Sequence, residues 1–185
     1  MVVAEVTPVV ARPTPDEYAP FYAGYVAQIG EGADPLEVLH SQLQTLPALL
    51  GTVPEAEAGT RYAPGKWSIK EVVGHLGDAE RIFAYRLLRI VRGDATPLSG
   101  FDQDEYVRVG AFDAQPLADL VAQWAAARRG TLALGQGLHA AAWPRRGTAN
   151  GKAISARALL YIIPGHVRHH IDVLRTRYGV GRPGA

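Results

Sequence analysis

The stretch that decides the fold is RYAPGKWSIKEVVGHLGDAERIFAYRLLRIVRG, residues 61–93. Ser68 and Glu71 have the S-x-x-E spacing of a capping box, which marks the start of a helix. Apolar residues then recur every three or four positions as far as Ile90, and this spacing is typical of one buried helix face. The stretch therefore predicts a long amphipathic helix that ends at Gly93.

Similar periodicity continues on both sides of this helix. Asp34 and Pro35 form a second helix start, and a seam of leucines follows as far as Leu50. We expect the other helices at about 35–50, 116–134 and 155–178, with a short aromatic-rich helix at 14–28. Strand signals are almost absent. The sequence therefore predicts an all-α protein, a four-helix bundle with a short N-terminal helix docked on it.

Two connections complete the expected organisation. About 20 residues, 93–112, separate the second and third bundle helices, and loops of this length tend to be functional or mobile. The stretch HAAAWPRRGTANGKAI, residues 139–154, is also expected to be a loop. We predict a single domain over residues 14–180, preceded by an extension at 1–13 and followed by a tail at 181–185.

Composition excludes several classes of protein. The 185 residues are 48% hydrophobic and 20% charged, with a formal charge of +1, which is ordinary for a globular domain. Because basic residues are not concentrated on one stretch, we expect no nucleic-acid binding. The absence of cysteine excludes a disulfide scaffold and thiolate ligands. No targeting signal or apolar stretch long enough for a membrane span is evident, so the expected location is cytoplasmic.

Three of the six histidines belong together. His166 and His170 are four residues apart in a predicted helix, so they lie one turn apart on one face and continue its apolar stripe. His75 lies on the inward face of the helix in 61–93. The other histidines, for which we expect ordinary non-ligand roles, are His40, His139 and His169.

Two imidazoles at this spacing and a third from a facing helix can supply three nitrogen ligands to one divalent metal. Three protein ligands leave one coordination position open, which is the arrangement of catalytic zinc sites. Zinc and nickel both suit imidazole ligands, and the sequence does not choose between them. Since ligation requires neutral histidines, binding should weaken as the pH falls through about 6. The alternative is that His75, His166 and His170 are hydrogen-bonded packing residues.

The motifs together resemble those of the DinB family, also called DinB/YfiT-like, of metal-binding four-helix bundles. The resemblance rests on residues 61–93, on PLSGFDQDEY and RRGTANGK, and on the closing YIIPGHVRHHIDVLRTRY, and it extends from about Asp16 to Tyr178. It implies a metal held by His75, His166 and His170, the set that the helix geometry also selects. It further implies frequent dimerisation, and a low-molecular-weight thiol as cofactor in some members.

Pro164 is a departure from a regular helix. It lies two residues before His166 and removes the amide that would bond the carbonyl of Leu160. A bend there would either aim His166 toward the metal or disturb the spacing. We favour the first, because the H-x-x-x-H pair follows the proline and keeps its periodicity.

Two enzymatic reactions fit such a site, a thiol-dependent S-transfer and a hydrolysis. Hydrolysis needs a general base, for which the candidates are Asp78, Glu80, Asp102, Asp104 and Glu105, with solvated surface charge as the alternative. A thiol would have to come from a cofactor, since the chain has no cysteine.

Arginines of the same helix could contribute to binding. Arg81 and Arg86 could hold a carboxylate of the cofactor, with ordinary surface roles as the alternative. A function of another class is also open, a non-catalytic homodimeric bundle that is linked to the stress response and binds a metal or a small ligand.

Overall fold

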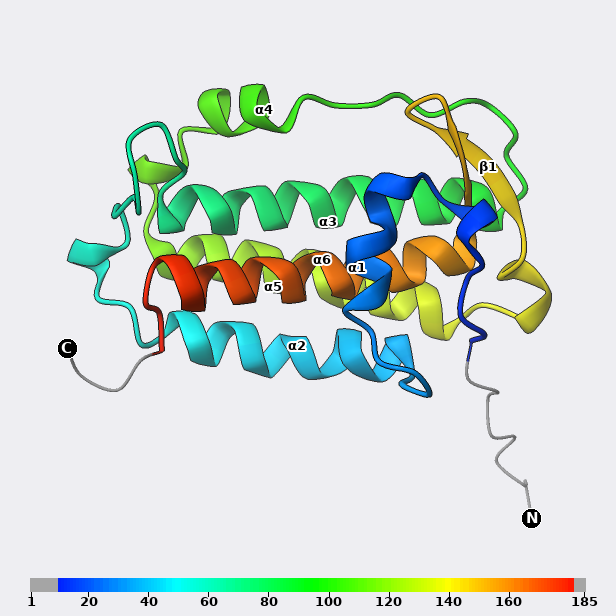
Figure 1. Cartoon of the computed structure of the whole chain (residues 1–185), viewed down its shortest axis with the longest axis horizontal. Helices are drawn as coiled ribbons and strands as arrows, with labels where there is room; N and C mark the ends of the chain where they lie inside the picture. Colours follow the sequence, from blue (N-terminus) through cyan, green and yellow to red (C-terminus); the bar gives the residue numbers. More distant parts are fainter. Residues whose placement is uncertain (1–9, 182–185) are drawn as a thin grey trace, which may run out of the picture.

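The computed structural model describes residues 10–181 and consists mainly of helices (Figure 1). The predicted four-helix bundle is confirmed. Its four long helices are α2 (Pro35–Leu50), α3 (Ile69–Val91), α5 (Leu117–Gln136) and α6 (Ala156–Arg177). The sequence placed these helices within about two residues of their observed ends, and Gly130 does not interrupt α5.

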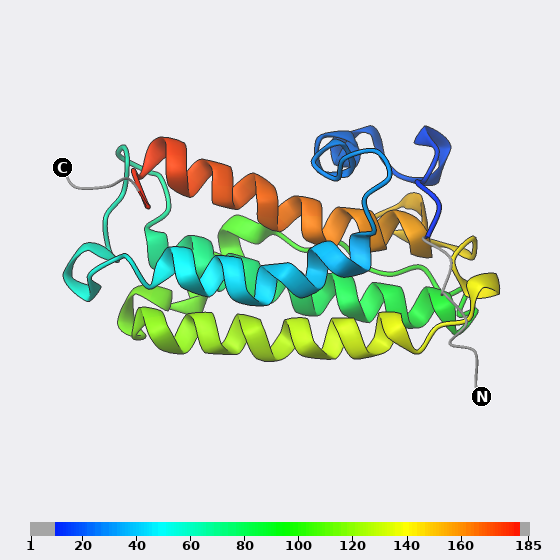
Figure 2. The same cartoon turned by 90° about the horizontal axis from the view of Figure 1, so that it is seen from below.

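The four helices form a bundle in which sequence neighbours are not always spatial neighbours. Helix α3 packs against α5 and α6, and α2 packs against the same two helices. Consequently α2 and α3 lie on one diagonal of the bundle and α5 and α6 on the other (Figure 2). Helices α2 and α6 run in one direction, while α3 and α5 run in the opposite one (Figure 1).

This topology explains the long connection after α3. Because α3 and α5 are neighbours that run in the same direction, the chain must return along the whole bundle before α5 can begin (Figure 1). The sequence predicted that this connection is a loop throughout. Instead it contains α4 (Gln103–Gly110) and a 3₁₀ turn at Phe112–Ala114. Asp102 caps α4 by accepting bonds from the amides of Asp104 and Glu105.

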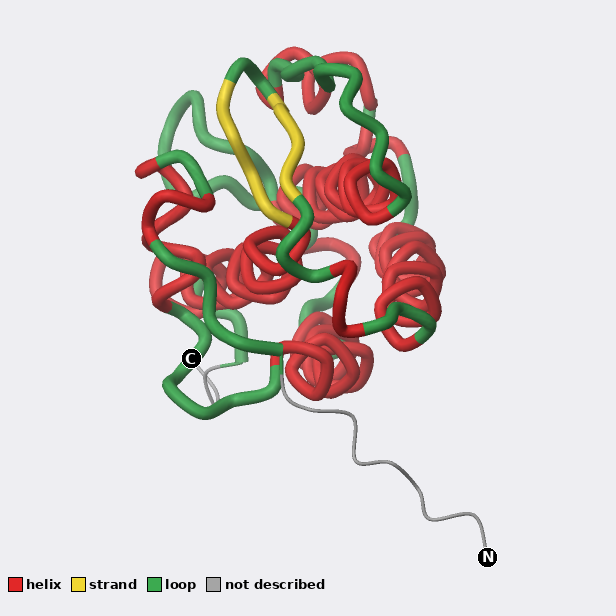
Figure 3. The backbone as a smooth tube through the Cα atoms, turned by 90° about the vertical axis from the view of Figure 1, so that its right-hand side faces the viewer, coloured by secondary structure: helices red, strands yellow, loops and turns green. Residues whose placement is uncertain are grey.

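The expected loop at 139–154 is wrong in its second half. Strands β1 (Arg146–Ala149) and β2 (Lys152–Ser155) form an antiparallel hairpin at one end of the bundle (Figure 3). Its two-residue turn consists of Asn150 and Gly151, both with positive φ, at 51° and 69°. An Asn-Gly pair favours such a turn because both residues tolerate this backbone conformation.

The N-terminal helix expected at 14–28 is broken into three pieces. They are 3₁₀ turns at Pro15–Glu17 and Pro20–Tyr22 and the short helix α1 (Ala23–Ala27). Pro20 causes the break, since a proline disfavours helical geometry at the preceding residue, and Ala19 is extended there with ψ at 142°. Helix α1 packs against α6, which places its one aromatic side chain, Tyr25, over the bundle.

A buried ion pair lies inside the bundle. Glu80 of α3 and Arg128 of α5 are 2% and 0% exposed. The guanidinium donates to both oxygens of the carboxylate, over 2.9 and 2.7 Å. Thr131 also donates to Glu80, and Gln42 of α2 accepts from Arg128. Charge and hydrogen-bonding capacity are thus matched inside the core.

No helix among the described residues is long and apolar enough to cross a membrane. Most of the expected extension at 1–13 and tail at 181–185 lies outside the described residues. Residues 10–13 belong to no helix or strand, and Val10 is buried, where its carbonyl accepts from the hydroxyl of Tyr161.

The capping box of α3 supports a stability prediction. The Ser68 hydroxyl accepts from the Glu71 amide over 3.0 Å, and the Glu71 carboxylate accepts from the Ser68 amide over 2.8 Å. Ser68→Ala removes one bond of this pair and also the bond that the hydroxyl donates to Asp113, so it should lower the free energy of unfolding by at least about 1 kcal/mol. Chemical denaturation measures the loss. Ser41→Ala, which removes a hydroxyl within α2, is the control, and equal stability of the two variants would contradict the role of the cap.

The buried ion pair supports a second prediction. Arg128→Met leaves the carboxylate of Glu80 buried without its cation, so it should cost about 3–5 kcal/mol. Adding Glu80→Leu to Arg128→Met should restore part of this loss, because the uncompensated charge is gone. Denaturation curves of both variants test the prediction. A double variant no more stable than Arg128→Met would show that packing, and not charge, dominates here.

Candidate metal centre

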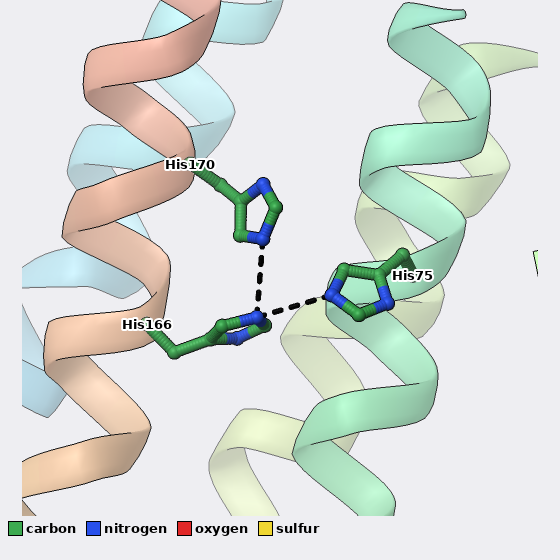
Figure 4. Close-up of side chains that lie close together, drawn as sticks. All are labelled: His75, His166 and His170. Atoms are coloured by element: carbon green, nitrogen blue, oxygen red, sulfur yellow. Dashed lines mark hydrogen bonds between the residues drawn. The ribbon is translucent and has the colours of Figure 1, made fainter. Parts of the chain in front are cut away.

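The structure brings together the three histidines that the sequence singled out. His75 projects from α3, and His166 and His170 project from α6, into the interface between these two packed helices (Figure 4). They form a group in which one potential ligand atom from each residue lies within 4.8 Å of the others. Helix α6 continues through Pro164, so the proline does not disturb the one-turn spacing of the pair.

The ring nitrogens that face the centre of the group are the Nε2 atoms. The Nε2 of His166 lies 3.1 Å from the Nε2 of His75 and 3.1 Å from the Nε2 of His170 (Figure 4). Three nitrogens on a tetrahedral zinc ion would lie about 3.3 Å apart, from the usual zinc–nitrogen bond length. The two separations from the His166 Nε2 are close to this value, and the three ligand atoms lie within 4.8 Å of one another, which suits one small cation.

Burial keeps the three rings neutral. His75 and His166 are only 3% and 5% exposed. Desolvation lowers the pKa of His75 to about 4 and holds the pKa values of His166 and His170 well below the usual range. Neutral imidazole is the form that ligates metals. Protons should therefore compete with a metal at a pH lower than the value of about 6 inferred from the sequence.

The surroundings of the three rings are aromatic. The ring of Trp67 lies 4.8 Å from that of His75, and the rings of Tyr25 and Phe83 lie 5.2 and 5.8 Å from that of His166. Tyr25 reaches this position because α1 crosses α6 at Gly165, where any larger residue would collide with the Tyr25 carbonyl. The glycine thus allows α1 to cover one side of the site.

A pocket of about 220 Å³ leads to the histidines. His75 and His166 form part of its wall, and most of the rest is aromatic. The other ring residues of the wall are Phe21, Tyr22, Tyr25, Phe83 and Phe101. Its polar side chains besides the histidines come from Arg86, Gln103 and Asn150. Such a concave, largely apolar space with a few polar groups is typical of a small-molecule site.

The remaining histidines lie outside the group. His40 and His139 are exposed, on α2 and before the hairpin. His169 is also exposed, and its ring packs at 5.5 Å from Tyr25 and 5.1 Å from His170.

The Nδ1 atom of His170 is buried, and no hydrogen-bond partner for it lies among the described residues. Ring packing therefore sets the orientation of His170.

None of the candidate general bases lines this pocket among the described residues. Asp102, Asp104 and Glu105 are exposed at the start of α4, and Asp78 pairs with Arg81 over 3.4 Å. For Glu80, the two roles expected from the sequence, a general base in the pocket and a solvated surface charge, are both wrong. Its carboxylate is buried and pairs with Arg128.

The two arginines proposed as carboxylate ligands differ in their surroundings. Arg81 is exposed and pairs with Asp78. Arg86 is buried and lines the pocket. The aromatic wall was not predicted from the sequence, although the cluster of aromatic residues in 18–25 was a visible signal of it. Asn150 was not predicted as a pocket residue either, although the Asn-Gly turn was a signal for it.

Comparisons with known proteins agree with this architecture. A family model described as the DinB superfamily matches residues 39–174. No curated protein matches the sequence.

The solved structures that are similar to the chain include the following two. YfiT from Bacillus subtilis, described as a probable metal-dependent hydrolase with an unusual four-helix bundle topology, has a TM-score of 0.71 and 18% identity, over 80% of this chain and 87% of that one. A mycothiol-dependent maleylpyruvate isomerase has a TM-score of 0.65 and 16% identity, over 80% of this chain and 60% of that one. At such identities the likeness shows the fold alone.

The buried histidines predict an acid-sensitive fold in the metal-free protein. An unfolded histidine takes up a proton below pH 6.5, whereas folded His75 does so only near pH 4. Stability should therefore fall as the pH drops from 6.5 toward 4, by about 2 kcal/mol at pH 5 from His75 alone. Denaturation of chelator-treated protein at pH 7.5 and 5 measures this. His75→Gln should reduce the fall and His139→Gln should not, and an equal fall in all three proteins would refute the prediction.

Proposed function

The chain belongs to the DinB superfamily, and from this premise we propose that it binds one divalent metal ion, zinc or nickel, through His75, His166 and His170. The observation that carries the proposal is the convergence of three Nε2 atoms, from His75, His166 and His170, beside an aromatic pocket that His75 and His166 line. Two hydrogen bonds cannot both be ideal at the single lone pair of the His166 Nε2. A cation, in contrast, accepts a lone pair from each ring.

The reaction that this site supports best is a thiol-dependent S-transfer to a small electrophile. A metal with an open position would lower the pKa of a thiol or water that it binds and so generate the nucleophile. A bound thiol needs no separate base to stay deprotonated, which suits a pocket whose described wall holds no carboxylate. Hydrolysis is the second candidate, because YfiT is described as a probable metal-dependent hydrolase.

The chain's own residues would orient the reactants. His75 and His166 present the metal to one end of the pocket, while the aromatic side chains exclude water and hold an apolar body. We also propose the partners expected from the sequence, a small-molecule substrate, a thiol cofactor and a second copy of the chain, in a cytoplasmic protein. The alternative is a non-catalytic, metal-binding dimer linked to the stress response.

Metal content tests the proposed ligands. Untagged protein should contain about one zinc or nickel ion per chain, measured by elemental mass spectrometry. His75→Ala and His170→Ala should each lose it while circular dichroism shows most of the helicity retained. His169→Ala, a neighbour outside the group, is the matched control. Full metal content in the two ligand variants, or wild type that takes up no added zinc, would contradict the assignment of these histidines as metal ligands.

The reaction class is tested with two substrates. Zinc-loaded protein is incubated with a low-molecular-weight thiol and an aromatic halide, and separately with an activated ester. Consumption of the thiol with release of one halide ion per thioether formed, both absent with His170→Ala, supports S-transfer. Ester cleavage alone, with the same dependence on His170, favours hydrolysis. The absence of both activities favours the non-catalytic alternative.

A further inference from the structure

Arg86 is a buried cation in the wall of the histidine pocket. Its side chain is 2% exposed, and it lies on the face of α3 that also carries His75 and Phe83. Eleven residues separate it from His75, which corresponds to roughly 16 Å along the helix axis. Since side chains of a helix lean toward its N-terminus, Arg86 leans toward the histidine end of the pocket.

Arg86 differs from the other buried charges because it has no counter-ion among the described residues. Glu17 pairs with Arg157, Lys70 pairs with Glu55, and Glu80 pairs with Arg128. No carboxylate oxygen of the described residues lies within 4.0 Å of the guanidinium of Arg86. A buried charge without a partner is costly, so a position that retains one requires an explanation.

The structure holds this guanidinium in place without satisfying it. One nitrogen donates to the carbonyl of Ser99 over 2.8 Å, and this is the hydrogen bond that the described residues provide for five N–H groups. The guanidinium carbon lies 5.9 and 6.0 Å from the ring centres of Phe83 and Phe101. The planar group is therefore set between two rings, with donors left for a ligand.

The segment that carries Ser99 and Phe101 is itself anchored. The amide of Leu98 donates to the Thr148 carbonyl over 2.8 Å, and the Leu98 carbonyl accepts from the Asn150 amide over 2.9 Å. These bonds attach the segment to β1 as a short parallel bridge. The orientation of Arg86 therefore depends on the hairpin and is fixed before any ligand enters.

We infer that Arg86 anchors the carboxylate of a small ligand with a flat apolar body, which lies among the aromatic side chains and points its other end at the histidines. A planar guanidinium matches a carboxylate in shape and charge, and one arginine balances one negative charge. That this ligand is the substrate rests on the proposed function, but its binding to Arg86 does not require the metal.

Benzoate is a suitable probe, and benzamide is its uncharged match. An NMR titration should show benzoate binding to wild type both after chelation and after zinc loading, with benzamide binding much more weakly. Arg86→Gln keeps a donor for the Ser99 carbonyl but removes the charge, so it should weaken benzoate binding about tenfold or more in both forms. Arg86→Lys should lose part of the affinity.

Arg81→Gln is the matched control. Arg81 lies on the same helix and lines a neighbouring hollow that Arg86 also borders, but it is absent from the wall of the histidine pocket. Its variant should bind benzoate like wild type. Equal weakening by Arg81→Gln and Arg86→Gln would place the anion in the other hollow and overturn the inference.

Two further outcomes would also overturn it. One is unchanged benzoate affinity in a folded Arg86→Gln protein, or no benzoate binding to wild type. The other is binding that occurs only with zinc and ignores Arg86, since the carboxylate would then be a metal ligand. Failure of the metal proposal looks different, because zinc-treated protein would then contain no bound zinc by elemental analysis, while Arg86→Gln would still weaken benzoate binding.

Discussion

The position of the histidines depends on the buried pair of Glu80 and Arg128. This pair joins α3 to α5, and Arg128 also donates to Gln42 of α2. Gln42 in turn donates to the carbonyl of Pro164 over 2.8 Å, two residues before His166. One chain of polar contacts thus connects all four bundle helices and fixes how far α3 and α6 are shifted along each other. Apolar surfaces alone would tolerate sliding, whereas a buried ion pair does not.

The parallel course of α3 and α5 has consequences for the pocket. It requires the chain to cross the length of the bundle between them, and this return segment supplies Phe101 to the pocket wall and the Ser99 carbonyl that accepts from Arg86. The hairpin before α6 then holds the segment in place through Leu98. A bundle with antiparallel neighbours throughout would need only short turns here. The segment that the topology requires therefore forms one part of the pocket wall, and α1 forms another part.

The sequence was informative where local rules apply and uninformative where they do not. The Ser68 cap and the spacing of His166 and His170 follow from helix geometry, so the bundle and the histidine group could be predicted. The burial of Glu80 could not, because its partner is 48 residues away and the sequence does not indicate how α3 and α5 meet. The hairpin was not predicted, although the Asn150-Gly151 pair is typical of a hairpin turn. The low strand propensity of the flanking residues argued against strands on either side of it.

The two polar ends of the pocket have the same electrostatic character. At one end, a divalent ion held by three neutral imidazoles would make the site positive, and at the other end the guanidinium of Arg86 is positive. No carboxylate of the described residues lines the space between them. Such a pocket disfavours cations and stabilises an anion, while its aromatic walls favour a flat apolar body. Because the rings also exclude water, each charge acts more strongly than it would in solvent. A proposed ligand would therefore be selected by its charge at the two ends of the pocket and by its shape between them.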